Sequence, residues 1–526
     1  MSPPRLQQHS HDKPAGEEQE PSNRTLKQQL KHENPTALPG AGAGMFGFGA
    51  GAGVNAILTA LIGITVVFIG GVAYVEWYKA NVLNKIEAAF EPGYDPALEL
   101  ANQPGRRGEV DEDGRRDYPQ SARHMKRKEQ EIMDSIMEGK EAGYYYLFVG
   151  PKGSGKTTMI LDAMRKVNAD SVSICDAHQD LEVFRLRLGK TLNYEYNEDS
   201  QTGLFQRRDP REGGPRLDIE RALNKLEKVA IRRAIKTGRP LVLVINDIHL
   251  FNNDDEGKQL LTQLQQRAER WAESGVVTML FNTDDFWPYT AMRQLANRMQ
   301  MFSVKDLDIN DSFQALKRLR RDAVGEELES DEVLTRAAEV AGGRLSYLSR
   351  LARSRDIIHH SERLKHSEKA WLLTHIGLIR DFDDDCMDEQ KWSSSSWLLL
   401  REFVRRRIVQ EEAFRKDLGT DPLVKSLPMP SIPYHECRQI MTRADFLDGL
   451  DRLNIISTDT NHEVWLDSAL TLQAAREVVT SEGFEELLRS VLARIEEVES
   501  LQRTRELKFK DLKHGDRVRV AIDKGG

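Results

Sequence analysis

A glycine-rich segment at positions 150 to 158, which ends in a lysine and two threonines, carries the strongest chemical signal in the sequence. Its residues fit the pattern Gly-x-x-x-x-Gly-Lys-Thr and are Gly150, Pro151, Lys152, Gly153, Ser154, Gly155, Lys156, Thr157 and Thr158. In such a P-loop, backbone N–H groups converge on phosphate oxygens, the lysine reaches the β- and γ-phosphates, and the threonine hydroxyl binds Mg²⁺. The segment therefore predicts a site for ATP and Mg²⁺, with Lys156 and Thr157 in the last two roles.

A second polar pair, Asn246 and Asp247, follows the apolar run from Leu241 to Ile245. Asn246 stands where an aspartate that supports Mg²⁺ is usual, and Asp247 stands where a catalytic Glu or Asp is usual. An amide can hold a metal-bound water but adds no charge. Two interpretations stay open: Asp247 is the general base and Asn246 gives weakened support to Mg²⁺, or Asp247 itself supports Mg²⁺ and no dedicated base follows.

Two further residues are candidates for catalysis. Asn282 ends the apolar run that begins at Gly275, where it can position the attacking water or merely cap the next turn. Arg298 precedes the apolar run from Met299 to Val304 and can reach the γ-phosphate of a neighbouring subunit as an arginine finger, or can be a solvated surface residue. Both alternatives stay open for each residue.

These residues all lie at the ends of short apolar runs, which are typical of buried parallel strands. The runs are 144–149, 171–175, 241–245, 275–281 and 299–304. The first of them leads straight into the P-loop and then into a helical pattern, the context that the motif requires. We therefore predict an α/β fold with a three-layer P-loop NTPase core and a parallel sheet.

The order of these motifs, followed by Gly342-Gly343-Arg344, resembles the AAA+/STAND superfamily, and within it the archaeal-type ATPases and the ATPase region of fungal mitochondrial escape proteins. The resemblance covers residues 121–362. It implies an ATPase core over 121–308 and a helical lid over 309–362. It also implies that Arg344 contacts the nucleotide as a sensor-2-like arginine.

The N-terminal part predicts a membrane anchor. The arm over 1–53 mixes Pro, Gln, His, Glu and Lys, ends in a Gly/Ala tract over 40–53, and is expected to be disordered. Residues 54–75 form an uncharged apolar stretch of the length that crosses a bilayer as a helix. A juxtamembrane helix and linker over 76–120 is expected next, with folding from about Tyr118. Because Lys79 and Lys85 follow the span, the C-terminal bulk is expected on the nucleotide-containing side. The family resemblance favours the mitochondrial inner membrane.

The C-terminal part predicts a winged-helix-like domain over 363–480, with a helix that opens on Ser394, and a C-terminal helix and tail over 481–526. The helix from Arg443 to Arg452 has more acidic than basic residues, so we expect a protein partner there, or on the C-terminal helix, and no nucleic acid. A homo-oligomer is compatible with the sequence.

The whole composition is compatible with these predictions. The net charge of −8 gives no overall attraction to nucleic acid, and three cysteines are too few for a disulfide framework or a zinc cluster. We expect a membrane-anchored ATPase that uses MgATP binding and hydrolysis to switch its lid and winged helix on a protein partner. The alternatives are a nucleotide-gated scaffold with little or no hydrolysis and a nucleic-acid-associated membrane tether.

Overall fold

The computed structural model describes residues 50–98, 127–196, 214–325, 329–380, 387–418, 427–504 and 517. The chain divides into two compact units, residues 1–71 and 72–526, and each is described by itself. Most of the predicted disordered arm and most of the predicted linker lie outside the described residues. The predicted fold class is confirmed: a parallel sheet between helices, a helical lid, a winged helix domain and one long apolar helix.

The apolar helix is α1, Ala50–Ala88. Within the described ranges it is the one helix long and apolar enough to cross a membrane, with a mean hydropathy of 2.2 over its most apolar part. Between Leu58 and Val72 its apolar side chains are exposed, as Val67 and Phe68 illustrate at 76% and 71%. Its length and composition fit the roughly 20 apolar residues that a bilayer core requires.

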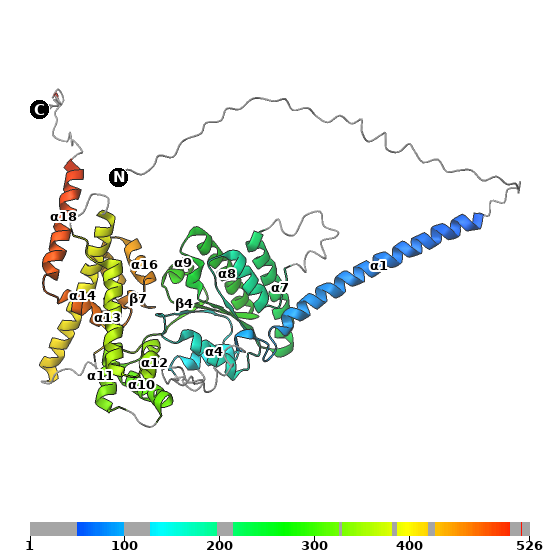
Figure 1. Ribbon diagram of the computed structural model, residues 1–526. Coiled ribbons are helices and arrows are strands. Elements are labelled where there is room, and N and C mark those ends of the chain that lie inside the picture. Colours follow the sequence, from blue (N-terminus) through cyan, green and yellow to red (C-terminus); the bar gives the residue numbers. More distant parts are fainter. Residues whose placement is uncertain are drawn as a thin grey trace, which may run out of the picture. The chain divides into compact units, whose positions relative to one another are not determined.

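Five parallel strands form the central sheet, in the order β2-β3-β4-β1-β5. Figure 1 shows this sheet, labelled at β4, between helices. The strands are β1 Tyr145–Val149, β2 Val172–Asp176, β3 Leu241–Asn246, β4 Val277–Thr283 and β5 Met299–Ser303. Successive side chains of a strand point to opposite faces, so Leu147 and Phe148 enter different core clusters. Both are fully buried, which explains why the strands read as continuous apolar runs.

Helices cover both faces of this sheet. On the face of Phe148 lie α3 Gln130–Met137 and α4 Lys156–Lys166. On the face of Leu147 lie the end of α1 together with α5 Leu181–Thr191, α7 Gly214–Thr237, α8 Asp255–Ser274 and α9 Trp287–Arg293. This arrangement is the predicted three-layer core.

The end of α1 belongs to the folded core, which corrects the predicted start of folding near Tyr118. Val82, Ile86 and Phe90 recur every four residues on one face of the chain and are buried in the cluster on the Leu147 side of the sheet. Farther along, a carboxylate oxygen of Asp95 accepts a hydrogen bond from the Ile174 N–H of edge strand β2, at 3.0 Å. The predicted juxtamembrane helix is present, but its packing on the sheet could not be predicted from its helical spacing alone.

The lid consists of four helices, α10 Ile309–Val324, α11 Asp331–Ala341, α12 Leu345–Arg353 and α13 Ile357–Ile376. The first three pack around one apolar cluster together with the start of α13. The end of α13 continues past the predicted boundary at 362, because Leu372 and Ile376 are buried in the winged helix cluster instead.

The winged helix domain contains a three-stranded antiparallel sheet, in the order β6-β8-β7, among helices. Its elements are α14 Met387–Leu418, β6 Ile432–Pro433, α15 Tyr434–Met441, α16 Ala444–Arg452, β7 Ile456–Thr458, β8 Glu463–Leu466 and α17 Ala469–Val479. The predicted pair of helices and the following hairpin are present.

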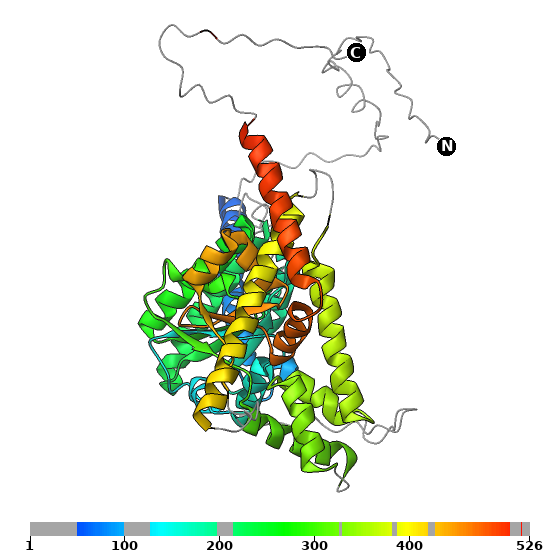
Figure 2. The same ribbon diagram turned by 90° about the vertical axis from the view of Figure 1, so that its left-hand side faces the viewer.

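The two long helices of this part of the chain, α14 and the last helix, differ in how they compare with the prediction. Helix α14 begins at Met387, so Ser394 is inside the helix and is not its N-cap; its hydroxyl donates to the Lys391 carbonyl at 3.3 Å. The last helix, α18 Phe484–Thr504, lies alongside α14 in both views (Figures 1 and 2). Buried Phe484 and Leu488 of its apolar stripe pack into the winged helix cluster, as predicted.

Candidate active site

The P-loop connects β1 to α4 at the carboxyl edge of the sheet. Gly153 and Gly155 have φ angles of 81° and 101°, a region that glycine adopts without strain. The turn places Lys156 at the start of α4, where its Nζ donates hydrogen bonds to the carbonyl oxygens of Gly150 at 2.7 Å and Pro151 at 3.1 Å. The ammonium group is therefore held beneath the loop that is expected to bind phosphates.

A carboxylate that sequence reasoning missed faces this lysine. Asp284 follows β4, and its Oδ1 lies 2.7 Å from Lys156 Nζ, with only 3% of the lysine side chain exposed. The Asp284 N–H donates to His249 Nδ1 at 3.2 Å. Its position gave a usable signal, since Asp284 comes two residues after Asn282 at the carboxyl end of the strand beside β1.

Three predicted site residues meet at the ends of β3, β4 and the P-loop. The Thr157 hydroxyl donates to Asn246 Oδ1 at 3.3 Å, and Asn282 Nδ2 donates to the same oxygen at 2.6 Å. Asn282 Nδ2 also lies 3.5 Å from Thr157 Oγ1. Adjacent parallel strands end at the same edge, which brings together residues that are far apart in sequence.

These three residues fit Mg²⁺, which prefers oxygen ligands. The Thr157 hydroxyl and the Asn246 amide oxygen point to one place. In addition, Asn282 Oδ1 is buried and has no hydrogen-bond partner among the described residues, so it can accept from a metal-bound water. When bound there, Mg²⁺ would neutralise charge on the phosphate oxygens.

Asp247 lies beside Asn246, whose Nδ2 donates to its carboxylate at 3.0 Å. Its backbone is left-handed, with φ 55° and ψ 45°, which turns the side chain out of the strand direction. Burial, and then the nearby carboxylates of Asp284 and Asp176, raise the pKa of Asp247 to about 6. A carboxylate with such a pKa is suited to accept a proton near neutral pH.

A possible second cation position lies next to Asp247. Ligand atoms of Asp247, His249 and Asp284 are within 4.8 Å of one another. The Lys156 ammonium already pairs with the Asp284 carboxylate, so a cation bound by these three residues would compete with the lysine for that carboxylate. Both interpretations of Asp247, as base or as support for Mg²⁺, agree with this geometry.

Arg298 is not part of the site in its own chain. It precedes β5, and its carbonyl accepts a hydrogen bond from the N–H of Tyr145, the first residue of β1, at 3.2 Å. The P-loop leaves the other end of β1, so five strand residues, or roughly 16 Å, separate the two places. A role for Arg298 in a neighbouring subunit stays a prediction.

Arg344 is buried against the P-loop, but its guanidinium is occupied by protein groups. Nε donates to Asp306 at 2.7 Å, and Nη1 donates to the Lys152 carbonyl at 2.6 Å and to Asp467 at 3.0 Å. Nη2 donates to the Asp467 carbonyl. Arg344 therefore joins the backbone of the P-loop to the winged helix domain, which begins its helix α17 just after Asp467.

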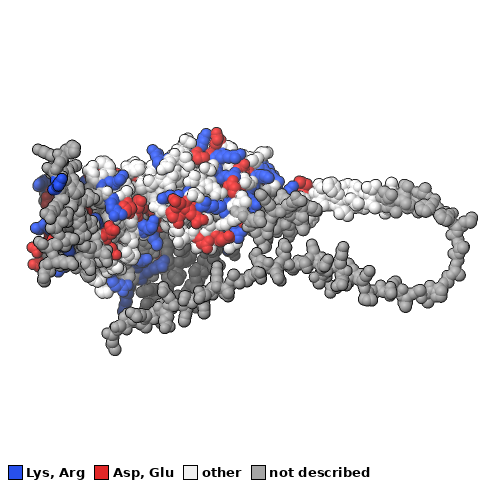
Figure 3. Space-filling view, turned by 90° about the horizontal axis from the view of Figure 1, so that it is seen from above, with Lys and Arg blue, Asp and Glu red and all other residues white. Residues whose placement is uncertain are grey.

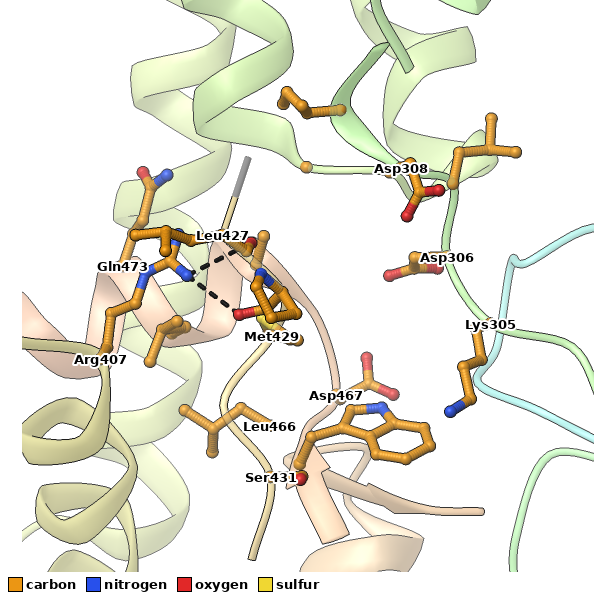
Figure 4. A pocket seen from close by; sticks show the side chains of 18 of the residues that line it. Lys305, Asp306, Asp308, Arg407, Leu427, Met429, Ser431, Leu466, Asp467 and Gln473 are labelled. Atoms are coloured by element: carbon orange, nitrogen blue, oxygen red, sulfur yellow. Dashed lines mark hydrogen bonds between the residues drawn. The ribbon is translucent and has the colours of Figure 1, made fainter. Parts of the chain in front are cut away.

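The two acidic partners of Arg344 come from different parts of the fold. Asp306 follows β5 and Asp467 follows β8, and both line a cavity of about 970 Å³ (Figure 4). Burial raises the pKa of Asp467 to about 6 in spite of the opposing effect of Arg344. Sequence reasoning missed Asp467, because nothing in its neighbourhood resembles a nucleotide-site motif.

The parallel sheet, the P-loop and the polar residues at the strand ends define a P-loop NTPase. Residues 126–279 match the family described as AAA ATPase domain, and residues 373–499 match the C-terminal winged helix domain of fungal AAA proteins. The chain is therefore similar to AAA ATPases over the first of these regions and to fungal AAA proteins over the second. Among curated proteins, none matches this chain.

Several solved structures are distantly similar. A Walker-type ATPase of Pyrococcus abyssi is 14% identical over 67% of this chain and 96% of that chain, with a TM-score of 0.43. The ORC2 protein of Aeropyrum pernix, in ADPNP-ADP complexes, is 13% identical over 77% and 99%, with a TM-score of 0.36. The ORC1 protein of Aeropyrum pernix in complex with DNA is 12% identical over 70% and 96%, with a TM-score of 0.35. At these values the similarities carry no functional argument.

Proposed function

We propose that this chain is a membrane-anchored ATPase in which MgATP binding and hydrolysis change the contacts of the lid and the winged helix, and thereby act on a protein partner. The observation that carries the proposal is the position of Arg344. One guanidinium group bonds to the P-loop carbonyl of Lys152 and to the Asp467 carboxylate of the winged helix domain. A shift of the P-loop backbone on nucleotide binding would alter the geometry of this connection.

The lid supports the same proposal, because its helix α12 begins directly on the P-loop. The Ser346 N–H donates to the Gly153 carbonyl at 3.2 Å. A Cβ atom placed on Gly153 would lie 2.4 Å from Ser346 Oγ, and one placed on Gly155 would lie 2.9 Å from a Leu345 methyl carbon. A movement of the P-loop at Gly153 or Gly155 would therefore change its contacts with Leu345 and Ser346 of the lid.

We assign the catalytic roles as follows. Lys156 binds the β- and γ-phosphates, Thr157 and Asn246 hold Mg²⁺, and Asn282 orients the water that attacks. Asp247 accepts the proton of that water in our preferred interpretation. Backbone N–H groups of the remaining P-loop residues contact the phosphates, and Arg344 responds to the loop through Lys152.

The winged helix is proposed to bind a protein and not a nucleic acid. Helix α16 faces the ATPase core: an Asp451 carboxylate oxygen accepts a hydrogen bond from the Phe286 N–H at 2.7 Å. The Phe286 ring also packs edge-on against His462 at 5.7 Å. Arg443 pairs with Asp445 on the same helix, so little positive charge is available for phosphates.

The test uses the full chain in nanodiscs. ATP hydrolysis is measured together with hydrogen–deuterium exchange in α12 and α17, with and without MgATP. We expect turnover, and altered exchange in both helices that is lost in Lys156→Ala. Exchange that responds to MgATP without turnover would favour the nucleotide-gated scaffold. Neither response in the wild-type chain would refute the proposal.

Membrane anchoring is tested separately. Alkaline carbonate should fail to extract the full chain, because an apolar helix of this length is more stable in the bilayer than in water. Deletion of residues 54–75 should release the protein. A location in the mitochondrial inner membrane is our proposal from the family resemblance, and fluorescence microscopy of the tagged full chain tests it.

A further inference from the structure

A groove of about 430 Å³ lies between the end of α1 and α7. Its lining includes four basic residues and one acidic residue, Glu76. The basic residues are Lys79 from α1 and Lys225, Lys228 and Arg232 from α7. The groove therefore has an excess of positive charge, which suits an anionic ligand.

Two of the four basic side chains are held in place by neighbours. Arg232 donates to Asn84 Oδ1 at 3.0 Å, and the Lys225 ammonium lies 4.7 Å from the centre of the Tyr194 ring. The other two are exposed. Lys79 pairs with Glu76 at the surface, and Lys228 has no ion-pair partner within the part of the chain that the structure describes. Lys228 is thus available to a ligand, whereas Lys79 would exchange its exposed partner Glu76 for the ligand.

The groove begins where the apolar stretch of α1 ends. Tyr74 and Trp77 are exposed and their rings lie 6.0 Å apart, an arrangement typical of residues at a membrane–water interface. Tyr78, which lines the groove, is the next residue after Trp77. Since a helix rises 1.5 Å per residue, Lys79 lies within one turn of Trp77 and Tyr78.

The exposed face of α7 has the composition of a helix that lies on a membrane surface. Lys225, Lys228 and Arg232 share one face through spacings of three and four residues, and Lys236 continues it. Beside them Ile235 exposes 82% of its surface. Figure 3 shows Lys and Arg side chains among Asp and Glu side chains over the visible surface of the folded part. Basic residues next to an exposed aliphatic one favour an anionic lipid surface.

We propose that this groove binds the phosphate headgroup of an anionic phospholipid in the membrane that α1 enters. The proposal rests on the membrane anchoring proposed above. The headgroup phosphate would lie among Lys79, Lys225, Lys228 and Arg232, and Tyr78 would lie at the level of the glycerol backbone. The groove would then fix the ATPase domain to the lipid surface, beyond the attachment that the helix alone provides.

Native mass spectrometry of the detergent-purified full chain tests the proposal, with phosphatidylglycerol and phosphatidylcholine as probes. We expect phosphatidylglycerol to bind more tightly. The double variant Lys79→Gln/Lys228→Gln should bind phosphatidylglycerol about 30-fold more weakly, because each basic residue near an anionic surface contributes about five-fold. Its binding of phosphatidylcholine should not change. Arg489→Gln, an exposed basic residue on α18, is the matched control and should bind both lipids like the wild type.

Three results would overturn the inference: equal affinity for the two lipids, unchanged phosphatidylglycerol binding in the double variant, or equally tight binding of soluble glycerol 3-phosphate, which would identify a site for free phosphate esters. Lys79→Arg/Lys228→Arg keeps the charge and should retain binding, which separates charge from folding effects. Release of the full chain by carbonate would refute membrane anchoring itself. Resistance to carbonate without lipid preference would refute only the groove.

Discussion

Asp284 should compete with the nucleotide for the P-loop lysine. In the structure its carboxylate lies 2.7 Å from Lys156 Nζ, and the two side chains are 15% and 3% exposed. A phosphate group that binds Lys156 must share or displace this carboxylate. Asp284→Asn removes the negative charge and leaves a side chain of nearly the same shape. We therefore expect the variant to be less stable without nucleotide and to bind MgATP more tightly.

The size of both effects follows from the same ion pair. Loss of one partner from a buried pair costs about 3–5 kcal/mol. Lys156 keeps its bonds to the carbonyl oxygens of Gly150 and Pro151, and asparagine still offers an amide oxygen, so we expect a loss of about 2 kcal/mol. The nucleotide no longer has to displace the carboxylate. The same free energy therefore appears as an approximately 30-fold gain in MgATP affinity.

The assay combines urea unfolding without nucleotide and calorimetric titration with MgATP, both on the full chain. Asp162→Asn is the matched control, since Asp162 lies on α4 and pairs with Arg165 and not with Lys156. It should leave MgATP affinity unchanged. Equal or weaker MgATP binding by Asp284→Asn, with its stability unchanged, would refute the competition that we infer.

Three further predictions concern single residues. Lys156→Ala should abolish the rise in melting temperature caused by ATP, since backbone dipoles alone do not neutralise the β- and γ-phosphates; an unchanged rise would contradict the site. If Asp247 is the general base, Asp247→Asn should cut ATP turnover by about 10²-fold at nearly constant ATP affinity. If the variant instead binds MgATP more weakly but binds Mg²⁺-free ATP as the wild type does, Asp247 supports the metal ion. Asp285→Asn should raise the melting temperature at about pH 8 and much less at about pH 5, because burial raises the pKa of Asp285 to about 7 from 3.8. Between the pKa of about 3.8 in the unfolded chain and about 7 in the folded protein, the folded wild type binds more protons, so its stability falls as pH rises through this range. A gain in melting temperature that is the same at both pH values would contradict this prediction.

Local patterns were enough to predict the P-loop, the strand that precedes it and the helix that follows. The positions of Asn246 and Asn282 at adjacent strand ends could also be predicted, because parallel strands bring their carboxyl ends together. Long-range pairings could not. Asp467 is 123 residues from Arg344, and no spacing rule connects a residue after β8 to a residue before α12.

The end of α1 shows a different reason for an incorrect prediction. Val82, Ile86 and Phe90 have helical spacing, but so does any helix that continues from a membrane span. Only the contact of these residues with the sheet cluster shows that the domain begins there. The start of α14 is earlier than the predicted one for a related reason. Serine is a good N-cap, but it is also tolerated inside a helix when its hydroxyl donates to a preceding carbonyl, as Ser394 does to Lys391.

Asp95 has a consequence for how this protein can be produced and stored. Strand β2 is at the edge of the sheet, and Ile174 has both backbone groups satisfied by side chains: Asp95 accepts from its N–H, and the Thr191 hydroxyl donates to its carbonyl at 3.1 Å. A covered edge resists pairing with strands of other molecules. A truncated protein that starts after residue 98 would lose this carboxylate together with Val82, Ile86 and Phe90. Such a truncation would expose a strand edge and an apolar surface at once, and we expect it to aggregate, whereas a start between the apolar stretch and Val82 keeps both covered.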